Sequence, residues 1–122
     1  GILTRPETGR VKLNLDTMQP NLTLLDRVSG EIRWQGEPSH HQLSLRHLDV
    51  SREGVIVAGY QYQGPAADHR PLVVMKHPSS DSLQELPLPR EYVPQFKQYI
   101  ASIAVSPDGR VAVATAPRGN LT

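Results

Sequence analysis

Three histidines and an aspartate lie close together in the stretch HHQLSLRHLD, residues 40–49. His40, His41, His47 and Asp49 offer imidazole and carboxylate groups, which are common ligands of zinc and iron. On an extended strand, His47 and Asp49 would share one face, whereas His41 would lie at or before the first residue of the strand. The structural alternative is that His41 caps the start of the strand and His47 hydrogen-bonds a neighbouring sheet. An iron site built from these four residues is therefore an alternative hypothesis.

Arg46 and His47 form a second candidate site, this time for a ligand. A planar guanidinium next to an imidazole suits a carboxylate or a phosphate. A salt bridge between neighbouring sheets would explain the same pair, and the sequence leaves both interpretations open.

Asn14 and Asp16 form a third candidate site, because they place two oxygen ligands two residues apart, with the thioether of Met18 close by. These side chains would suit a ligand or a metal. The competing interpretation is that they organise a loop through side-chain-to-backbone hydrogen bonds.

The composition argues against several functional classes. Thirteen basic and twelve acidic residues give a formal charge of +1, and the basic residues form no run, so nucleic acid is not an expected partner. No apolar run approaches the roughly 20 residues of a membrane span. Cysteine is absent, and no Gly-x-Ser-x-Gly, His-Glu-x-x-His or phosphate-binding glycine loop occurs. We therefore expect no enzymatic activity and no cofactor, apart from iron under the alternative hypothesis.

Short apolar runs separated by turn residues dominate the chain. Eleven prolines and nine glycines leave few windows for a helix, so the runs predict β-strands. The expected all-β fold has a loop-rich segment at residues 1–20, followed by eight strands at residues 21–26, 31–34, 43–50, 55–62, 71–77, 83–88, 99–105 and 110–116.

Two of the expected hairpins resemble each other. The run VSREG at residues 50–54 aligns with VSPDG at residues 105–109, at an offset of 55 residues. In both turns serine and an acidic residue can cap the backbone, and glycine can take a left-handed conformation. Arg46 and His47 align with Ala101 and Ser102, so the repeat itself does not require the polar pair.

A repeat of four short antiparallel strands is typical of a β-propeller blade. We expect residues 43–88 to form one full blade, with strand pairs of the adjacent blades at residues 21–35 and 99–117. About two blades cannot close a propeller, because unpaired strand edges would remain. The sequence therefore predicts either a section of a longer chain or a unit that self-associates.

Three stretches carry a resemblance to a known family. GRVKLNLDTMQPNL (residues 9–22), HQLSLRHL (residues 41–48) and SIAVSPDGRVAVATAPRGN (residues 102–120) resemble the bacterial domain-of-unknown-function family 1513. The resemblance implies an exported, periplasmic β-propeller from iron-uptake gene neighbourhoods, with protein partners of such a system and no assigned activity. Residues 1–20 themselves show no basic-then-apolar leader pattern.

These observations lead to two hypotheses. The first is a non-enzymatic binding or scaffold module associated with bacterial iron uptake. The second is a metal-binding or redox-linked iron-handling protein that uses the histidines at positions 40, 41 and 47.

Overall fold

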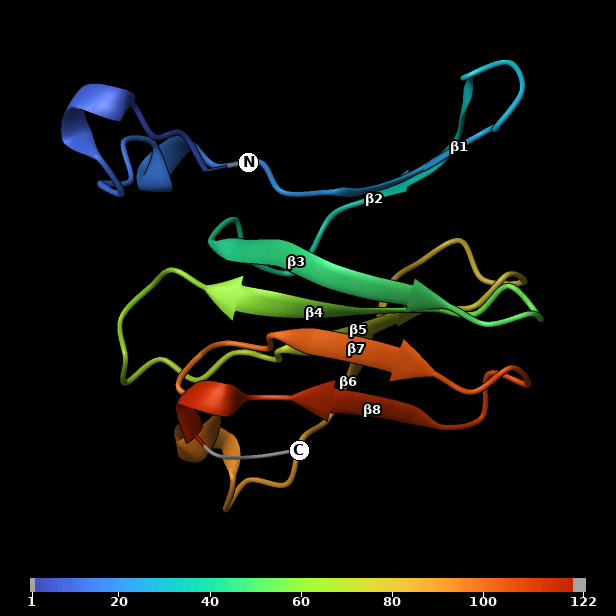
Figure 1. Ribbon diagram of the computed structural model, residues 1–122. Coiled ribbons are helices and arrows are strands. Elements are labelled where there is room, and N and C mark those ends of the chain that lie inside the picture. The colour runs from blue at the N-terminus through green and yellow to red at the C-terminus, as the bar shows by residue number, and fades with distance from the viewer. Residues whose placement is uncertain (1, 120–122) are drawn as a thin grey trace.

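The computed structural model describes residues 2–119 and shows an antiparallel, all-β fold (Figure 1). The expected all-β class is confirmed, and each observed strand falls on an expected one with a difference of a few residues at the ends. The strands are β1 (Leu22–Leu25), β2 (Ile32–Gly36), β3 (Leu43–Val50), β4 (Ile56–Tyr62), β5 (Val73–Lys76), β6 (Gln84–Leu86), β7 (Ser102–Val105) and β8 (Ala112–Thr115).

The eight strands are divided among three sheets. One sheet contains β1 and β2, the next contains β3, β4, β5 and β6 in that order, and the third contains β7 and β8. Every pairing is antiparallel and joins strands that are consecutive in the chain. The central sheet therefore covers the stretch expected to form a blade, while the assignment of these sheets to a propeller stays a prediction.

Four short 3-10 turns complete the described structure. Two of them, η1 (Pro6–Thr8) and η2 (Leu15–Thr17), shape the segment before β1. The others, η3 (Val93–Phe96) and η4 (Pro117–Gly119), flank the β7–β8 hairpin and contact each other. Within residues 2–119 no helix is long and apolar enough to cross a membrane.

The two similar turns have the conformation that their residues predict. Gly54 and Gly109 both have a left-handed backbone, with φ of 84° and 70°. In the first turn the Ser51 hydroxyl accepts a hydrogen bond from the Val55 amide, and in the second the Ser106 hydroxyl accepts one from the Val111 amide. The same side-chain chemistry therefore closes both hairpins.

The two inner strands of the central sheet, β4 and β5, are covered on both faces, and nearly all of their residues are buried. A Cβ built on Gly59 would lie 2.5 Å from Ile100, just before β7, so the third sheet covers one face. On the other face, the Lys76 ammonium lies 5.0 Å from the ring centre of Trp34 in β2. The Trp34 indole also donates to the Asp81 carbonyl at 3.0 Å. The core therefore forms between sheets, around β4 and β5.

Hydrogen bonds join the central sheet to the third sheet along β3 and β4. The Val105 amide of β7 donates to the Asp49 carboxylate of β3 at 2.8 Å. The Arg52 amide donates to the Pro107 carbonyl at 3.0 Å, which connects the two similar turns. These bonds hold β7 against β3 although the two strands share no ladder.

Candidate functional site

A β-bulge lies at the position where the sequence singles out Arg46. Leu45 pairs with Tyr60, and the next pair joins His47 to Gly59, so the ladder skips Arg46. Bulges re-aim side chains and occur often beside functional sites. Arg46 is exposed, and its side chain lines a cavity of about 460 Å³.

We call this cavity the basic pocket. Three segments that are far apart in the chain contribute to it: the loop before β1, the β3–β4 hairpin and η4. Its described lining residues are Ile2, Thr4, Gly9, Arg10, Lys12, Arg46, Gln61 and Arg118. Half of them carry a positive charge, and none of those described is acidic. The pocket is therefore an electropositive hollow in a chain whose overall charge is nearly balanced.

No acid in the described part of the chain neutralises the cations of the basic pocket. None of the four forms an ion pair with a residue in the described part of the chain. Lys12 donates a hydrogen bond to the Gln63 side chain. The Arg118 guanidinium lies 4.8 Å from the ring centre of Tyr99, a cation–π contact that orients the side chain and leaves its charge in place.

Asn14 organises the loop that carries Arg10 and Lys12. Its side-chain oxygen accepts a hydrogen bond from the Leu3 amide at 2.6 Å, and the Leu13 amide donates to the Leu3 carbonyl at 2.9 Å. These bonds close a loop of about ten residues. The structural interpretation of Asn14 thus agrees with its contacts, and neither Asn14 nor the exposed Asp16 is part of the described lining of the basic pocket.

The two members of the Arg46–His47 pair separate in the structure. His47 is exposed on β3 and is not part of the described lining of the basic pocket. The sequence suggested that His47 forms the hydrogen bond to the neighbouring sheet. In the structure the Asp49 carboxylate does so, by accepting from the Val105 amide. Arg46 is therefore the member of the pair that the structure places at a cavity.

The histidines before β3 shape the start of that strand. The His40 Nδ1 accepts a hydrogen bond from the Gln42 amide at 3.1 Å, so the capping residue is His40 where His41 was expected. The His41 ring stacks on His40 with 4.6 Å between ring centres. Desolvation by burial, followed by the charge of Arg70, lowers the pKa of His40.

The four residues of the metal hypothesis do not converge. The Asp49 carboxylate accepts hydrogen bonds from the Val50 amide at 2.9 Å and the Val105 amide at 2.8 Å. Across residues 2–119, no group of three or more His, Cys, Asp or Glu side chains is arranged to hold a metal ion. The contacts of His40 and Asp49 are those of structural residues.

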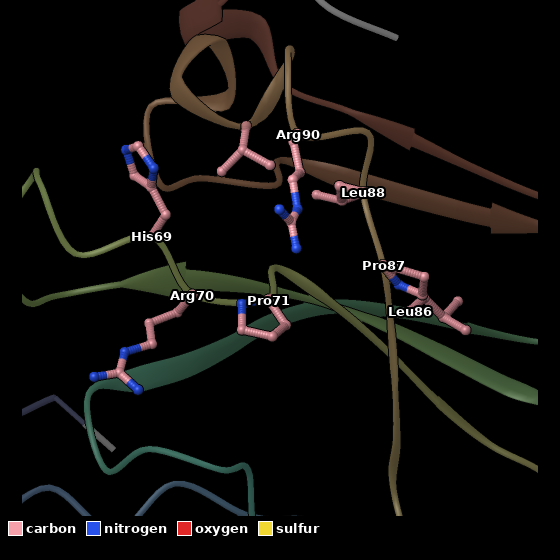
Figure 2. A pocket seen from close by; sticks show the side chains of 8 residues that line it. His69, Arg70, Pro71, Leu86, Pro87, Leu88 and Arg90 are labelled. Carbon is pink, nitrogen blue, oxygen red and sulfur yellow. The ribbon is translucent and has the colours of Figure 1, made fainter.

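A second cavity, of about 430 Å³, lies between β6, η3 and the segment leading into β5 (Figure 2). Figure 2 shows the Arg90 side chain directed between Leu88 and Pro71, while the Arg70 side chain points away from Arg90. Arg70 forms an ion pair with Asp68, with 2.9 Å between Nη2 and Oδ2. The walls are mainly proline, leucine and valine, so this cavity has less charge to offer an anion than the basic pocket has.

Three of the four cations in the basic pocket could not be found from the sequence. Arg10, Lys12 and Arg118 are isolated basic residues, and Arg118 is 72 positions after Arg46. Only the docking of η4 and of the loop before β1 against β3–β4 brings them together. The one local signal of a basic site is that Arg10 and Lys12 lie two residues apart, and such spacing is common on exposed loops.

Comparisons with known proteins identify a family for the chain. No curated protein and no solved structure matches the chain. The sequence as a whole, residues 1–122, matches the model of a described family, which supports the resemblance of its three stretches. The chain belongs to DUF1513, a family of proteins of unknown function.

Proposed function

We propose that this protein is a non-enzymatic binding module that holds a small carboxylate or phosphate in the basic pocket. The observation that carries the proposal is the gathering of Arg10, Lys12, Arg46 and Arg118 around one cavity with no acid among its described lining residues. On the basis of the family resemblance, the proposal also includes that the protein is exported from a bacterial cell and is associated with iron uptake.

The charge of the basic pocket favours an anion. Four like charges around one hollow repel one another, and the protein walls focus their field into it. A bound anion relieves that repulsion. The near-zero net charge of the chain limits the effect to this site, so the attraction is local.

The donors of the basic pocket suit oxygen anions. Three guanidinium groups present planar N–H forks that match the two oxygens of a carboxylate or the oxygens of a phosphate. The Gln61 side chain adds a neutral amide. A volume of about 460 Å³ lies within the usual range of small-molecule sites, roughly 300–1,000 Å³.

The pocket is held by contacts outside its lining. Asn14 closes the loop of Arg10 and Lys12, the bulge in β3 re-aims Arg46, and the ring of Tyr99 supports Arg118. A preorganised site loses less conformational entropy on binding than flexible surface lysines would.

Calorimetric titration with sodium succinate and with inorganic phosphate tests this proposal. At low ionic strength we expect measurable binding of at least one of them. Arg46→Ala and Arg118→Ala should each weaken that binding about tenfold, since a charged hydrogen bond contributes roughly 1.5–3 kcal/mol. Arg46→Lys should retain part of the affinity, because the charge remains while the fork is lost.

Arg52→Ala is the matched control, because Arg52 is an exposed arginine of the same hairpin and lies outside the described lining of the pocket. This variant and His47→Ala should bind as the wild type does. The proposal is wrong if neither anion binds, or if Arg52→Ala weakens binding as much as Arg46→Ala. Thermal unfolding of each variant checks that the fold is retained.

The iron-handling hypothesis gains no comparable support. It requires His40, His41, His47 and Asp49 to act together, and the backbone contacts of His40 and Asp49 assign them to local structure. We therefore propose no second function.

A further inference from the structure

A second charged cavity, of opposite sign, lies where the β2–β3 connection crosses the central sheet. Its volume is about 310 Å³, and we call it the acidic cavity. Two glutamates and a tyrosine line it together with apolar residues. The described lining residues are Glu37, Pro38, Ser39, Tyr60, Val74, Leu83 and Glu85.

Two polar atoms of the acidic cavity are buried without a partner among the described residues: the Tyr60 hydroxyl oxygen and Oε1 of Glu85. Tyr60 is 0% exposed. Native proteins satisfy more than about nine in ten buried polar groups, because an unpaired group loses its hydration without replacement. Both orphaned atoms belong to residues that line the same cavity, so one guest that reaches both atoms could satisfy them.

The register of the sheet places these groups together. Glu85 of β6 pairs directly with Val74 of β5, and Val74 pairs with Ala58 of β4, two residues before Tyr60. Because side chains alternate along a strand, Tyr60, Val74 and Glu85 share one face. That face is the one covered by the β2–β3 connection, which brings Glu37 over it.

No cation of the described chain neutralises these acids. Lys76 lies on the same face of β5, two residues after Val74, but its ammonium donates to the His77 carbonyl at 2.7 Å and lies over the Trp34 ring. Neither Glu37 nor Glu85 forms an ion pair within residues 2–119. Desolvation by burial, together with the charge of Glu85, raises the pKa of Tyr60, so the phenol stays neutral.

We infer that the acidic cavity binds a protonated primary amine. An ammonium group has three N–H donors, and Oε1 of Glu85, the Tyr60 hydroxyl and the Glu37 carboxylate offer it three acceptors. The alkyl chain of the amine would lie against Pro38, Val74 and Leu83. The same chemistry is presented by a free alkylamine and by the lysine side chain of a partner protein.

Two-dimensional NMR titration of the protein with n-butylammonium chloride tests this inference. We expect saturable shifts of the Val74 and Leu83 methyl signals. Glu85→Gln should weaken binding about tenfold, because it removes the charge and keeps the size of the side chain. Tyr60→Phe should also weaken binding while leaving the ring in the core. Glu53→Gln, in an exposed turn, should bind as the wild type does.

Three comparison ligands sharpen the result. n-Butanol lacks the charge and tetramethylammonium lacks the N–H donors, so both should fail to produce the saturable shifts. Nα-acetyl-lysine amide presents a lysine side chain: its binding indicates a protein partner, and butylammonium binding without it indicates a free amine.

The inference is overturned if the wild type does not bind butylammonium, or if n-butanol binds equally well. It is also overturned if binding appears only in Lys76→Met, since that result would mean that Lys76 itself occupies the cavity in solution. Because the Arg46→Ala variant leaves the acidic cavity intact, its amine binding should be unchanged, which separates this test from that of the basic pocket.

Discussion

Val57 of β4 and Val113 of β8 occupy corresponding positions in two hairpins whose turns use the same residue types but differ in length by one residue. Val57 pairs with Asp49 and Val113 pairs with Ala104, each one pair beyond the turn-proximal pair. Val57 is nevertheless 2% exposed and Val113 is 47% exposed. Local sequence closes both hairpins, but only β4 lies between two neighbouring sheets. The difference teaches that the turn determines the pairing of the strands and that the surrounding sheets determine their burial.

Replacing these two valines with alanine is the strongest test of that comparison. Val57→Ala should lower the free energy of unfolding by about 1.5–3 kcal/mol, because it removes two buried methyl groups from a packed core. Val113→Ala should change it by less than about 0.5 kcal/mol. Urea denaturation monitored by Trp34 fluorescence measures both values. Equal losses would mean that the two hairpins have the same environment in solution.

The two turn glycines should differ less in their effect on the free energy of unfolding than the two valines do. Here the larger loss is expected in the β7–β8 hairpin. Gly54→Ala should cost roughly 1–2 kcal/mol, because an L-residue is strained at positive φ. Gly109→Ala should cost more, since its Cβ would also lie 2.8 Å from a Val55 methyl, whereas the nearest atom to a Cβ at Gly54 is 3.7 Å away. The same urea series measures the pair. A larger loss at Gly54 would contradict the packing of the second turn against Val55.

The smallest expected effect concerns acid stability of the second turn. Hydrogen bonds from the Ser106 hydroxyl and then from the Arg110 amide lower the pKa of Asp108 below 3.8. A lowered folded-state pKa stabilises the protein above the unfolded value, and the contribution is lost as the pH falls through the folded-state pKa. The stability difference between the wild type and Asp108→Asn should therefore be largest above pH 3.8 and shrink on acidification.

Denaturation series from pH 6 down to pH 2 would measure this difference. Glu53→Gln is the matched control, because Glu53 occupies the equivalent position of the first turn. A difference that widens on acidification for Asp108→Asn would show that its carboxylate does not stabilise the turn.

The strands and turns could be predicted because their causes are local. Short apolar runs define the strands, and Ser51 with Gly54, or Ser106 with Gly109, defines a turn within a few residues. The bulge at Arg46 was not predicted, although Gly59, an isolated glycine inside the partner strand, lies opposite it and is a residue that often marks a bulge. The identity of the strand cap was also missed, because HHQ offers two imidazoles and only the backbone geometry selects His40.

The basic pocket shows why the candidate site was only partly predictable. Arg46 stood out because the repeat gave it no counterpart, whereas Arg10, Lys12 and Arg118 are ordinary basic residues until the fold gathers them. The acidic cavity is similar, since Glu37 and Glu85 are 48 positions apart in the sequence. Convergence of distant charges is a property of tertiary structure, and no spacing rule encodes it.

The pairing of consecutive strands has a consequence for the order of folding. Each hairpin closes a short loop, so its nucleation costs little chain entropy and proceeds on the microsecond scale. The bond between Asp49 and the Val105 amide spans 56 residues and belongs to a slower docking step. Hairpins should therefore form first and separately, and both charged cavities should appear only when the sheets assemble.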